Sequence, residues 1–90
     1  MEGRHLVITG QVQGIGYRWS MVHAAQRVGA TGWVRNRYDG SVEAVVCGTP
    51  EVIAQMIAWA RQGPPGAQVD HVLVQYTEGD FAAFEQQTSE

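Results

Sequence analysis

Two short segments of the chain hold residue types that could bind a phosphate group and direct an attack on it. The first runs from Gly10 to Arg18 and carries Gly14 and Gly16, whose backbone freedom lets successive N–H groups turn toward one point. It lies between an expected strand and an expected helix, where unpaired N–H groups and the helix dipole favour an anion. The guanidinium of Arg18 would add a full charge and paired donors for two phosphate oxygens. The segment therefore predicts an anion site.

The usual nucleotide-binding loops do not fit this segment. A Walker loop would need Gly-Lys-Ser/Thr, and a dinucleotide fingerprint would need a glycine where Trp19 stands. The expected anion is therefore small. A plainer alternative is that the glycines only join a strand to a helix while Arg18 is a solvated surface residue, and the segment taken alone favours that alternative.

The second segment ends in Asn36, which follows an apolar run and precedes Arg37. A carboxamide can donate to one oxygen while it accepts a proton from a water molecule. It could hold that water in line with a phosphorus atom, and phosphoryl transfer depends mainly on such positioning and on charge stabilisation. The alternative is that Asn36, placed before a turn, only satisfies local backbone groups, and Asn36 alone favours this alternative.

The remaining reactive side chains form no recognisable catalytic or metal-binding motif. The three histidines are scattered without metal-ligand spacing, and the hydroxyl residues have no Asp–His partner in a recognisable motif. The single cysteine, Cys47, lies in an alternating apolar run and is expected to be a buried small side chain. We expect the three tryptophans to pack in the core or at its rim. We therefore assign no metal.

Length and composition limit the chain to one domain, residues 1–90. Its 90 residues are 44% hydrophobic, and 6 basic against 9 acidic residues give a net charge of −3. That charge argues against a surface built broadly for nucleic acid. No stretch approaches the ~20 apolar residues of a membrane helix, and the first residues lack a secretory pattern. We expect a cytoplasmic, monomeric protein without nucleic-acid or membrane partners.

The pattern of the first half predicts a strand, a helix and a hairpin. A strand is expected from Arg4 to Thr9, and a helix from Trp19 to Val28 that ends at Gly29. A second strand should run from Thr31 to Arg37. The Tyr38-Asp39-Gly40 turn should then lead into a third strand with alternating apolar residues from Val42 to Val46.

The second half predicts another helix and strand. Thr49-Pro50-Glu51 is a strong helix start, and the helix should reach about Arg61 before Gly63-Pro64-Pro65-Gly66 ends it. A fourth strand is expected from Val69 to Tyr76. A short fifth strand has room at residues 81–85, while the polar tail after Phe84 is expected to fray. This order predicts an α+β, ferredoxin-like split β-α-β sandwich, with an antiparallel sheet and two helices on one face.

Taken together, the two chemical segments resemble a known family. Val12-Gln13-Gly14-Ile15-Gly16-Tyr17-Arg18 and the run from Gly32 to Val42 look like the two characteristic segments of the acylphosphatases. Gly48 and the segments 63–67 and 69–72 also resemble that family, so the likeness covers nearly the whole chain. Only the polar, acidic tail departs from it.

The resemblance implies an enzyme that hydrolyses the carboxyl-phosphate bond of small acyl phosphates to a carboxylate and inorganic phosphate, without a metal or cofactor. Arg18 corresponds to the phosphate-binding arginine and Asn36 to the asparagine that orients the attacking water. The amides of the loop would surround the phosphate, which adds Gln13, Gly14, Ile15, Gly16 and Tyr17 to the site. Arg35 and Arg37 receive no catalytic role.

Two other classes of function stay open at this point. One is a non-catalytic anion-binding or regulatory module, like the acylphosphatase-like domain of larger carbamoyl-transfer proteins. The other is an RNA-binding sheet of the same topology, although the aromatic and basic motif on its central strands is missing.

Overall fold

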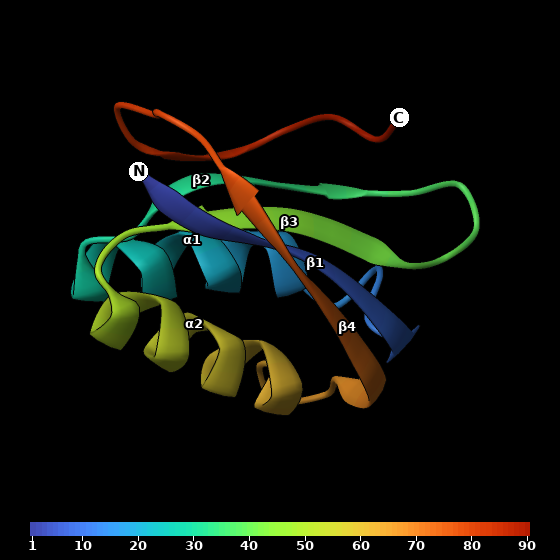
Figure 1. The fold of residues 1–90 in the computed structure, drawn as a ribbon. Coiled ribbons are helices and arrows are strands. Elements are labelled where there is room, and N and C mark those ends of the chain that lie inside the picture. The colour runs from blue at the N-terminus through green and yellow to red at the C-terminus, as the bar shows by residue number, and fades with distance from the viewer.

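The computed structural model describes all of residues 1–90 and contains a five-stranded sheet with two helices on one of its faces (Figure 1). The strands follow the order β4-β1-β3-β2-β5 across the sheet. The elements are β1 (Glu2–Gln11), α1 (Tyr17–Val28), β2 (Thr31–Asn36), β3 (Val42–Cys47), α2 (Pro50–Gln62), β4 (Gln68–Glu78) and β5 (Phe84–Gln86). The predicted order and the ferredoxin-like arrangement are confirmed.

The sheet is antiparallel except at one edge. β1 pairs with β3 and β4, and β2 pairs with β3, all antiparallel, whereas β5 lies parallel to β2. We expected the tail after Phe84 to fray, and this prediction is wrong. Beyond β5, Gln87 N–H donates to the Val34 carbonyl at 2.8 Å and Glu90 N–H donates to the Asn36 carbonyl at 3.3 Å. The free edge of β2 has backbone N–H and C=O groups that need hydrogen-bond partners. Another backbone segment can supply these partners whatever its side chains are, so a polar tail can pair there.

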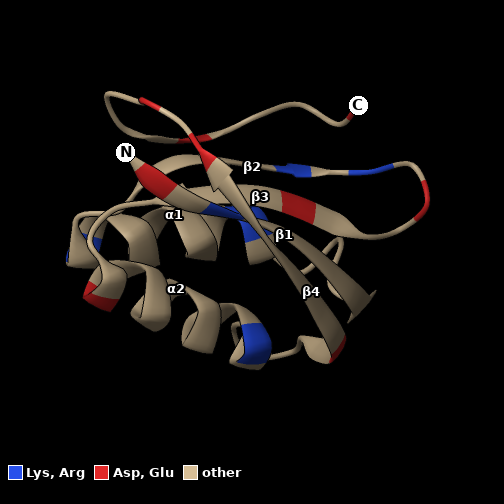
Figure 2. Cartoon of the chain, viewed as in Figure 1, with Lys and Arg blue, Asp and Glu red and all other residues tan.

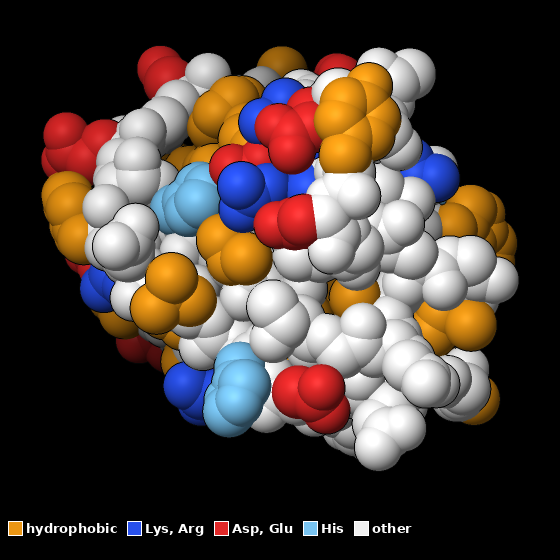
Figure 3. Space-filling model, turned by 90° about the vertical axis from the view of Figure 1, so that its right-hand side faces the viewer, with side chains coloured by type: hydrophobic (Ala, Val, Ile, Leu, Met, Phe, Trp, Pro, Cys, Tyr) orange, Lys and Arg blue, Asp and Glu red, His pale blue; other side chains and the backbone are white.

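Acidic and basic residues are interspersed over the molecule (Figure 2). Figure 3 shows side chains of both signs lying next to one another on one face rather than in separate patches. Arg4 pairs with Glu2, Arg35 with Glu43 and Arg37 with Glu90. The other three of the six arginines have no carboxylate partner; they are Arg18, Arg27 and Arg61. Their charges are therefore available to other anions.

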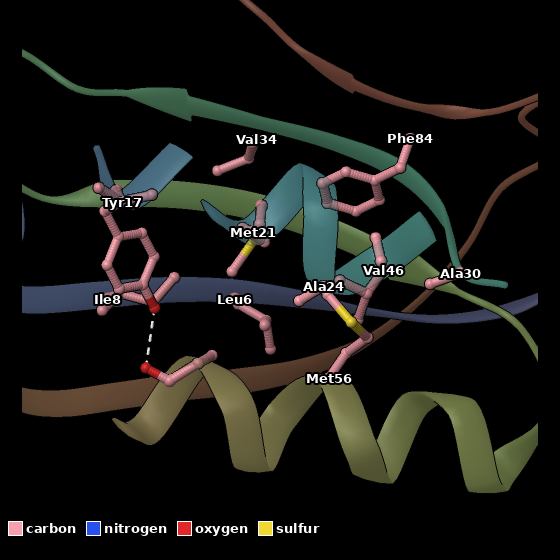
Figure 4. Close-up of a cluster of buried hydrophobic side chains, with 14 of the residues drawn as sticks. Leu6, Ile8, Tyr17, Met21, Ala24, Ala30, Val34, Val46, Met56 and Phe84 are labelled. Atoms are coloured by element: carbon pink, nitrogen blue, oxygen red, sulfur yellow. Dashed lines mark hydrogen bonds between the residues drawn. The ribbon is translucent and has the colours of Figure 1, made fainter. Parts of the chain in front are cut away.

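The core lies between the sheet and the two helices (Figure 4). Its buried side chains come from every layer and include Leu6 and Ile8 of β1, Met21 of α1 and Met56 of α2. Tyr17 is also buried, and its hydroxyl donates to the Ala60 carbonyl at 2.8 Å. Burial raises the pKa of Tyr17 well above its ordinary value, so this hydroxyl stays protonated. The bond joins the first turn of α1 to the last turn of α2.

Local signals place the start of α2 and the end of α1 where the sequence predicts them, whereas α1 begins at Tyr17, two residues before the expected start at Trp19. The Thr49 hydroxyl accepts a hydrogen bond from Val52 N–H at 3.2 Å, and Pro50 begins α2. Gly29 ends α1 in a left-handed conformation. Cys47 is buried, as expected. Neither helix has the length and apolar character needed to cross a membrane.

Candidate active site

The loop between β1 and α1 presents a row of unpaired backbone donors. No N–H group from Gln13 to Trp19 finds a backbone or side-chain acceptor in the protein, and the helical bonds of α1 begin with Ser20 N–H to the Gly16 carbonyl. Gly14 and Gly16 both have φ of 78°, a left-handed conformation that glycine adopts without steric cost. No side chain caps α1, and no acidic residue stands in its first turn. This geometry suits a bound anion.

Arg18 supplies a positive charge beside this loop. Its Nη1 donates to the Gln87 carbonyl at 3.0 Å, and the side chain is only partly exposed. No carboxylate neutralises it, in contrast to Arg35 and Arg37. The tail therefore fixes one side of the guanidinium while its other N–H groups remain free to donate.

Asn36 ends β2 with its carboxamide unused. The side chain makes no hydrogen bond within the protein and is partly buried, while the backbone carbonyl accepts from Glu90 N–H. The local explanation, in which the side chain serves neighbouring backbone groups, does not describe this residue. Its donor and acceptor are free to bind a water molecule or an oxyanion.

A hollow of about 100 Å³ brings the loop, the arginine and the asparagine together. It is lined by Val12, Gly14, Gly16, Tyr17, Arg18, Trp19, Asn36 and Gln86. Gly14, Gly16, Tyr17, Arg18 and Asn36 are residues that the sequence analysis assigned to the site. The sequence does not predict the other three, which are Val12, Trp19 and Gln86. Trp19 looks like a packing residue in sequence, and the position of Gln86 depends on a strand whose place in the sheet the sequence does not specify.

Gln13 and Ile15 do not line the hollow, although both were assigned to the phosphate loop. The Gln13 side chain instead donates from Nε2 to the carbonyls of Arg37 and Ser41, each at 2.8 Å. Ile15 packs against the core. Their backbone N–H groups are unpaired, like those of the other loop residues. Each residue can therefore offer an anion only a main-chain donor.

The Gln13 side chain ties the loop to the β2–β3 hairpin. That hairpin is itself ordered by Asp39, whose Oδ1 accepts from Ser41 N–H at 2.9 Å and from Ser41 Oγ at 2.6 Å. These bonds hold the pKa of the Asp39 carboxyl below its ordinary value. Because Asn36 is the last residue of β2, directly before the turn of this hairpin, Gln13 also sets how the loop lies relative to Asn36.

The arrangement can bind a tetrahedral anion and place a polar group next to it. No group of three or more His, Cys, Asp and Glu side chains lies close enough together to hold a metal ion. The donors are backbone amides, one guanidinium and one carboxamide, which are suited to oxygen atoms that carry negative charge.

Comparison with known proteins places the chain in a family. The acylphosphatase family model matches residues 4–86. An acylphosphatase of Thiobacillus denitrificans is 52% identical over 98% of this chain and 99% of its own length. Among solved structures, an acylphosphatase from Coxiella burnetii superposes with a TM-score of 0.91 at 34% identity, over 96% of this chain and 93% of that one.

The crystal structure of acylphosphatase from Bacillus subtilis superposes with a TM-score of 0.92 at 26% identity, covering 97% of this chain and 99% of that one. The likeness thus extends over both the sequence and the fold, along almost the full length of these relatives. The chain belongs to the acylphosphatase family, a family of hydrolases.

Proposed function

We propose that this enzyme hydrolyses the carboxyl-phosphate bond of small acyl phosphates, without a metal or cofactor, and that Arg18 and Asn36 are its catalytic residues. The observation that carries the proposal is the hollow in which unpaired loop amides, an arginine without a carboxylate partner and an unused carboxamide meet. Its volume of about 100 Å³ suits one small anion rather than a nucleotide.

The phosphoryl group would sit in the loop formed by Gln13, Gly14, Ile15, Gly16 and Tyr17. Their backbone N–H groups, with those of Arg18 and Trp19, point their positive ends at its oxygens, and the dipole of α1 adds to this field. The free N–H groups of Arg18 grip two of the oxygens. These donors are held in place before the reaction, so they stabilise the charge of the transition state with little reorganisation.

Asn36 would orient the attacking water. Its carbonyl oxygen accepts one proton of the water, and its amide N–H can donate to a phosphoryl oxygen, which holds the water oxygen near phosphorus. The water oxygen bonds to phosphorus as the bond from phosphorus to the acyl oxygen breaks. The acyl group leaves with the electron pair of that bond as a carboxylate, and a water proton passes to phosphate or to solvent. A carboxylate is a weak base, so its departure requires no general acid.

The test is hydrolysis of acetyl and benzoyl phosphate by the purified protein, with and without a chelator such as EDTA. We expect turnover that the chelator leaves unchanged. Phosphate binding without turnover would instead indicate an anion-binding module, and loss of turnover with the chelator would contradict metal independence.

We also propose that the enzyme acts as a monomer in the cytoplasm, without nucleic-acid or membrane partners. The free thiol of Cys47 is compatible with a reducing compartment. The interspersed charges give no broad basic surface for a nucleic acid. Light scattering of the purified protein and fractionation of the cells that express it test the two parts separately.

A further inference from the structure

A second, larger hollow lies between the two helices. It measures about 350 Å³ and includes Trp19, His23 and Arg27 on α1, facing Trp59 on α2 and the Pro64-Pro65 turn that follows. The two helices lie side by side beneath the sheet in Figure 1. We name this hollow the interhelical groove. Its size falls in the range of small-molecule sites, roughly 300–1,000 Å³.

Trp19 connects the interhelical groove to the smaller hollow beside Arg18 and Asn36, which we call the phosphate hollow, because Trp19 lines both. Trp19 is 61% exposed, which is unusual for so large an apolar residue. It is held in place by His23, whose ring centroid lies 3.9 Å from that of Trp19. His23 Nδ1 in turn is 2.9 Å from the Trp19 carbonyl oxygen. A substrate with its phosphoryl group in the first hollow could therefore extend its acyl group over a fixed, flat, apolar wall.

The far end of the interhelical groove is positively charged. Arg27 has no hydrogen-bond or ion-pair partner within the protein, and no acidic residue lines the groove. Trp19, His23 and Arg27 follow one another at intervals of four residues, so they form one face of α1. From Trp19 to Arg27 the helix rises about 12 Å, and long helical side chains lean back toward the N-terminus, which brings the guanidinium nearer to the indole.

We propose that the interhelical groove is the subsite for the acyl group, and that it selects acyl phosphates whose acyl part is flat and apolar near the phosphate and carries a carboxylate at its far end. The indole of Trp19 receives the flat part, and the unpaired guanidinium of Arg27 receives the carboxylate. This assignment rests on the proposed function, since it takes the phosphoryl group to be bound beside Arg18.

Three substrates separate the parts of this assignment. Acetyl phosphate has almost no acyl group, benzoyl phosphate adds a flat ring, and 4-carboxybenzoyl phosphate adds a carboxylate at the far end of that ring. The wild-type kcat/KM should rise along this series. In Trp19→Ala the preference for benzoyl over acetyl phosphate should fall about tenfold, and Trp19→Phe should restore most of it.

Arg27→Gln tests the charged end. The preference for 4-carboxybenzoyl over benzoyl phosphate should fall about five- to tenfold, mainly through a higher KM, and added salt should weaken the same preference in the wild type. Arg61→Gln is the matched control, because Arg61 is also an unpaired arginine in the last turn of a helix but does not line the groove. It should leave all three substrates unaffected.

The outcomes distinguish this assignment from the proposed function. An equal loss for acetyl and benzoyl phosphate in Trp19→Ala would overturn the acyl subsite, because it would limit Trp19 to the phosphate hollow or to folding. An unchanged preference in Arg27→Gln would overturn the charged end. If the wild type hydrolysed none of the three substrates, the proposed function itself would fail.

Discussion

Nη1 of Arg18 and the carbonyl oxygen of Gln87 are 3.0 Å apart and joined by a hydrogen bond. The last residues of the chain thus contact the residue that we propose to hold the phosphate. They also run beside Asn36, whose carbonyl oxygen accepts from Glu90 N–H. A segment that looks dispensable in sequence therefore supports both proposed catalytic residues.

Removal of residues 87–90 should lower kcat/KM for benzoyl phosphate about tenfold, since a hydrogen bond to a charged group contributes about 1.5 kcal/mol. The deletion frees the Arg18 guanidinium to adopt unproductive rotamers. Steady-state kinetics would measure the loss. The matched control is Gln87→Ala, which keeps the backbone carbonyl and should retain most of the activity; an equal loss in Gln87→Ala would argue against the main-chain contact.

Arg18→Ala and Asn36→Ala should each lower kcat by about a hundredfold or more while the fold is kept, by analogy with the loss of one preorganised donor elsewhere. Arg18→Ala removes the charge on the phosphate, and Asn36→Ala removes the group that holds the water. Turnover of benzoyl phosphate and circular dichroism would check activity and fold. Arg61→Ala removes an arginine that lines neither hollow and should behave as the wild type, whereas near wild-type turnover in the first two variants would defeat the catalytic assignment.

Gln13→Ala should separate positioning from phosphate binding. The carbonyl groups of Arg37 and Ser41 lose their shared donor, so the loop is no longer tied to the hairpin, and the free energy of unfolding should fall by about 1–2 kcal/mol. The backbone N–H of residue 13 remains, so inorganic phosphate should still inhibit, with a weaker Ki. Urea unfolding and phosphate inhibition measure the two effects. An unchanged free energy of unfolding would show that the Gln13 side chain does not stabilise the loop.

Glu43 should make the stability of the folded protein depend on pH in the acid range. Its carboxylate lies 2.7 Å from His5 Nε2 and 2.7 Å from Arg35 Nε. Burial acts to raise the pKa of Glu43, but the hydrogen bonds from His5 and Arg35 outweigh it, so the pKa lies below its ordinary value of 4.5. A carboxyl group whose pKa is lower in the folded state than in the unfolded state stabilises the folded state. This contribution is complete at a pH above the unfolded-state pKa, and it is lost as the pH falls through the folded-state pKa.

Glu43→Gln should therefore lower the free energy of unfolding by about 1–3 kcal/mol at neutral pH and flatten its fall below pH 4.5. Thermal unfolding from pH 7 to pH 3 would measure both effects. Glu85→Gln changes an exposed carboxylate without a partner and is the control. A parallel pH profile in the wild type and Glu43→Gln would contradict the role given to this carboxylate.

Tyr17→Phe should destabilise the fold without impairing the chemistry. The substitution leaves the Ala60 carbonyl without its donor in a buried setting, which should lower the free energy of unfolding by about 1–3 kcal/mol. The backbone N–H of residue 17 is unchanged, so kcat for acetyl phosphate below the unfolding temperature should stay within about twofold. Calorimetry and kinetics would check the two statements, and a large fall in kcat would mean that the Tyr17 side chain contributes to the site.

The sequence was sufficient to predict the features that depend on nearby residues. The start of α2 at Thr49-Pro50, the end of α1 at Gly29 and the hairpin at Tyr38-Asp39-Gly40 follow from local backbone preferences, and the structure confirms them. The hollow shared by the loop and Asn36 was also expected, because the resemblance linked two segments that neither pattern could link alone.

What the sequence did not predict depends on contacts between distant segments. The parallel pairing of β5 with β2 is made by backbone groups that any side chains could accompany, so the polar residues after Phe84 carried no signal for it. The glutamine at 13 could serve an anion or a carbonyl equally well, and only the position of the hairpin decides between them. For the same reason, a Trp19 placed between two hollows could not be told from a packing residue.

The two edges of the sheet differ in one further respect. β5 has only three residues, and a strand this short offers another strand few backbone groups to pair with. At the opposite edge, β4 is 11 residues long and carries the exposed side chains of Leu73 and Tyr76. The two edges therefore differ in their resistance to aggregation. In a concentrated or partly unfolded sample, strands of other molecules would pair with β4. A charged residue in place of Leu73 would be the first change to make against such aggregation.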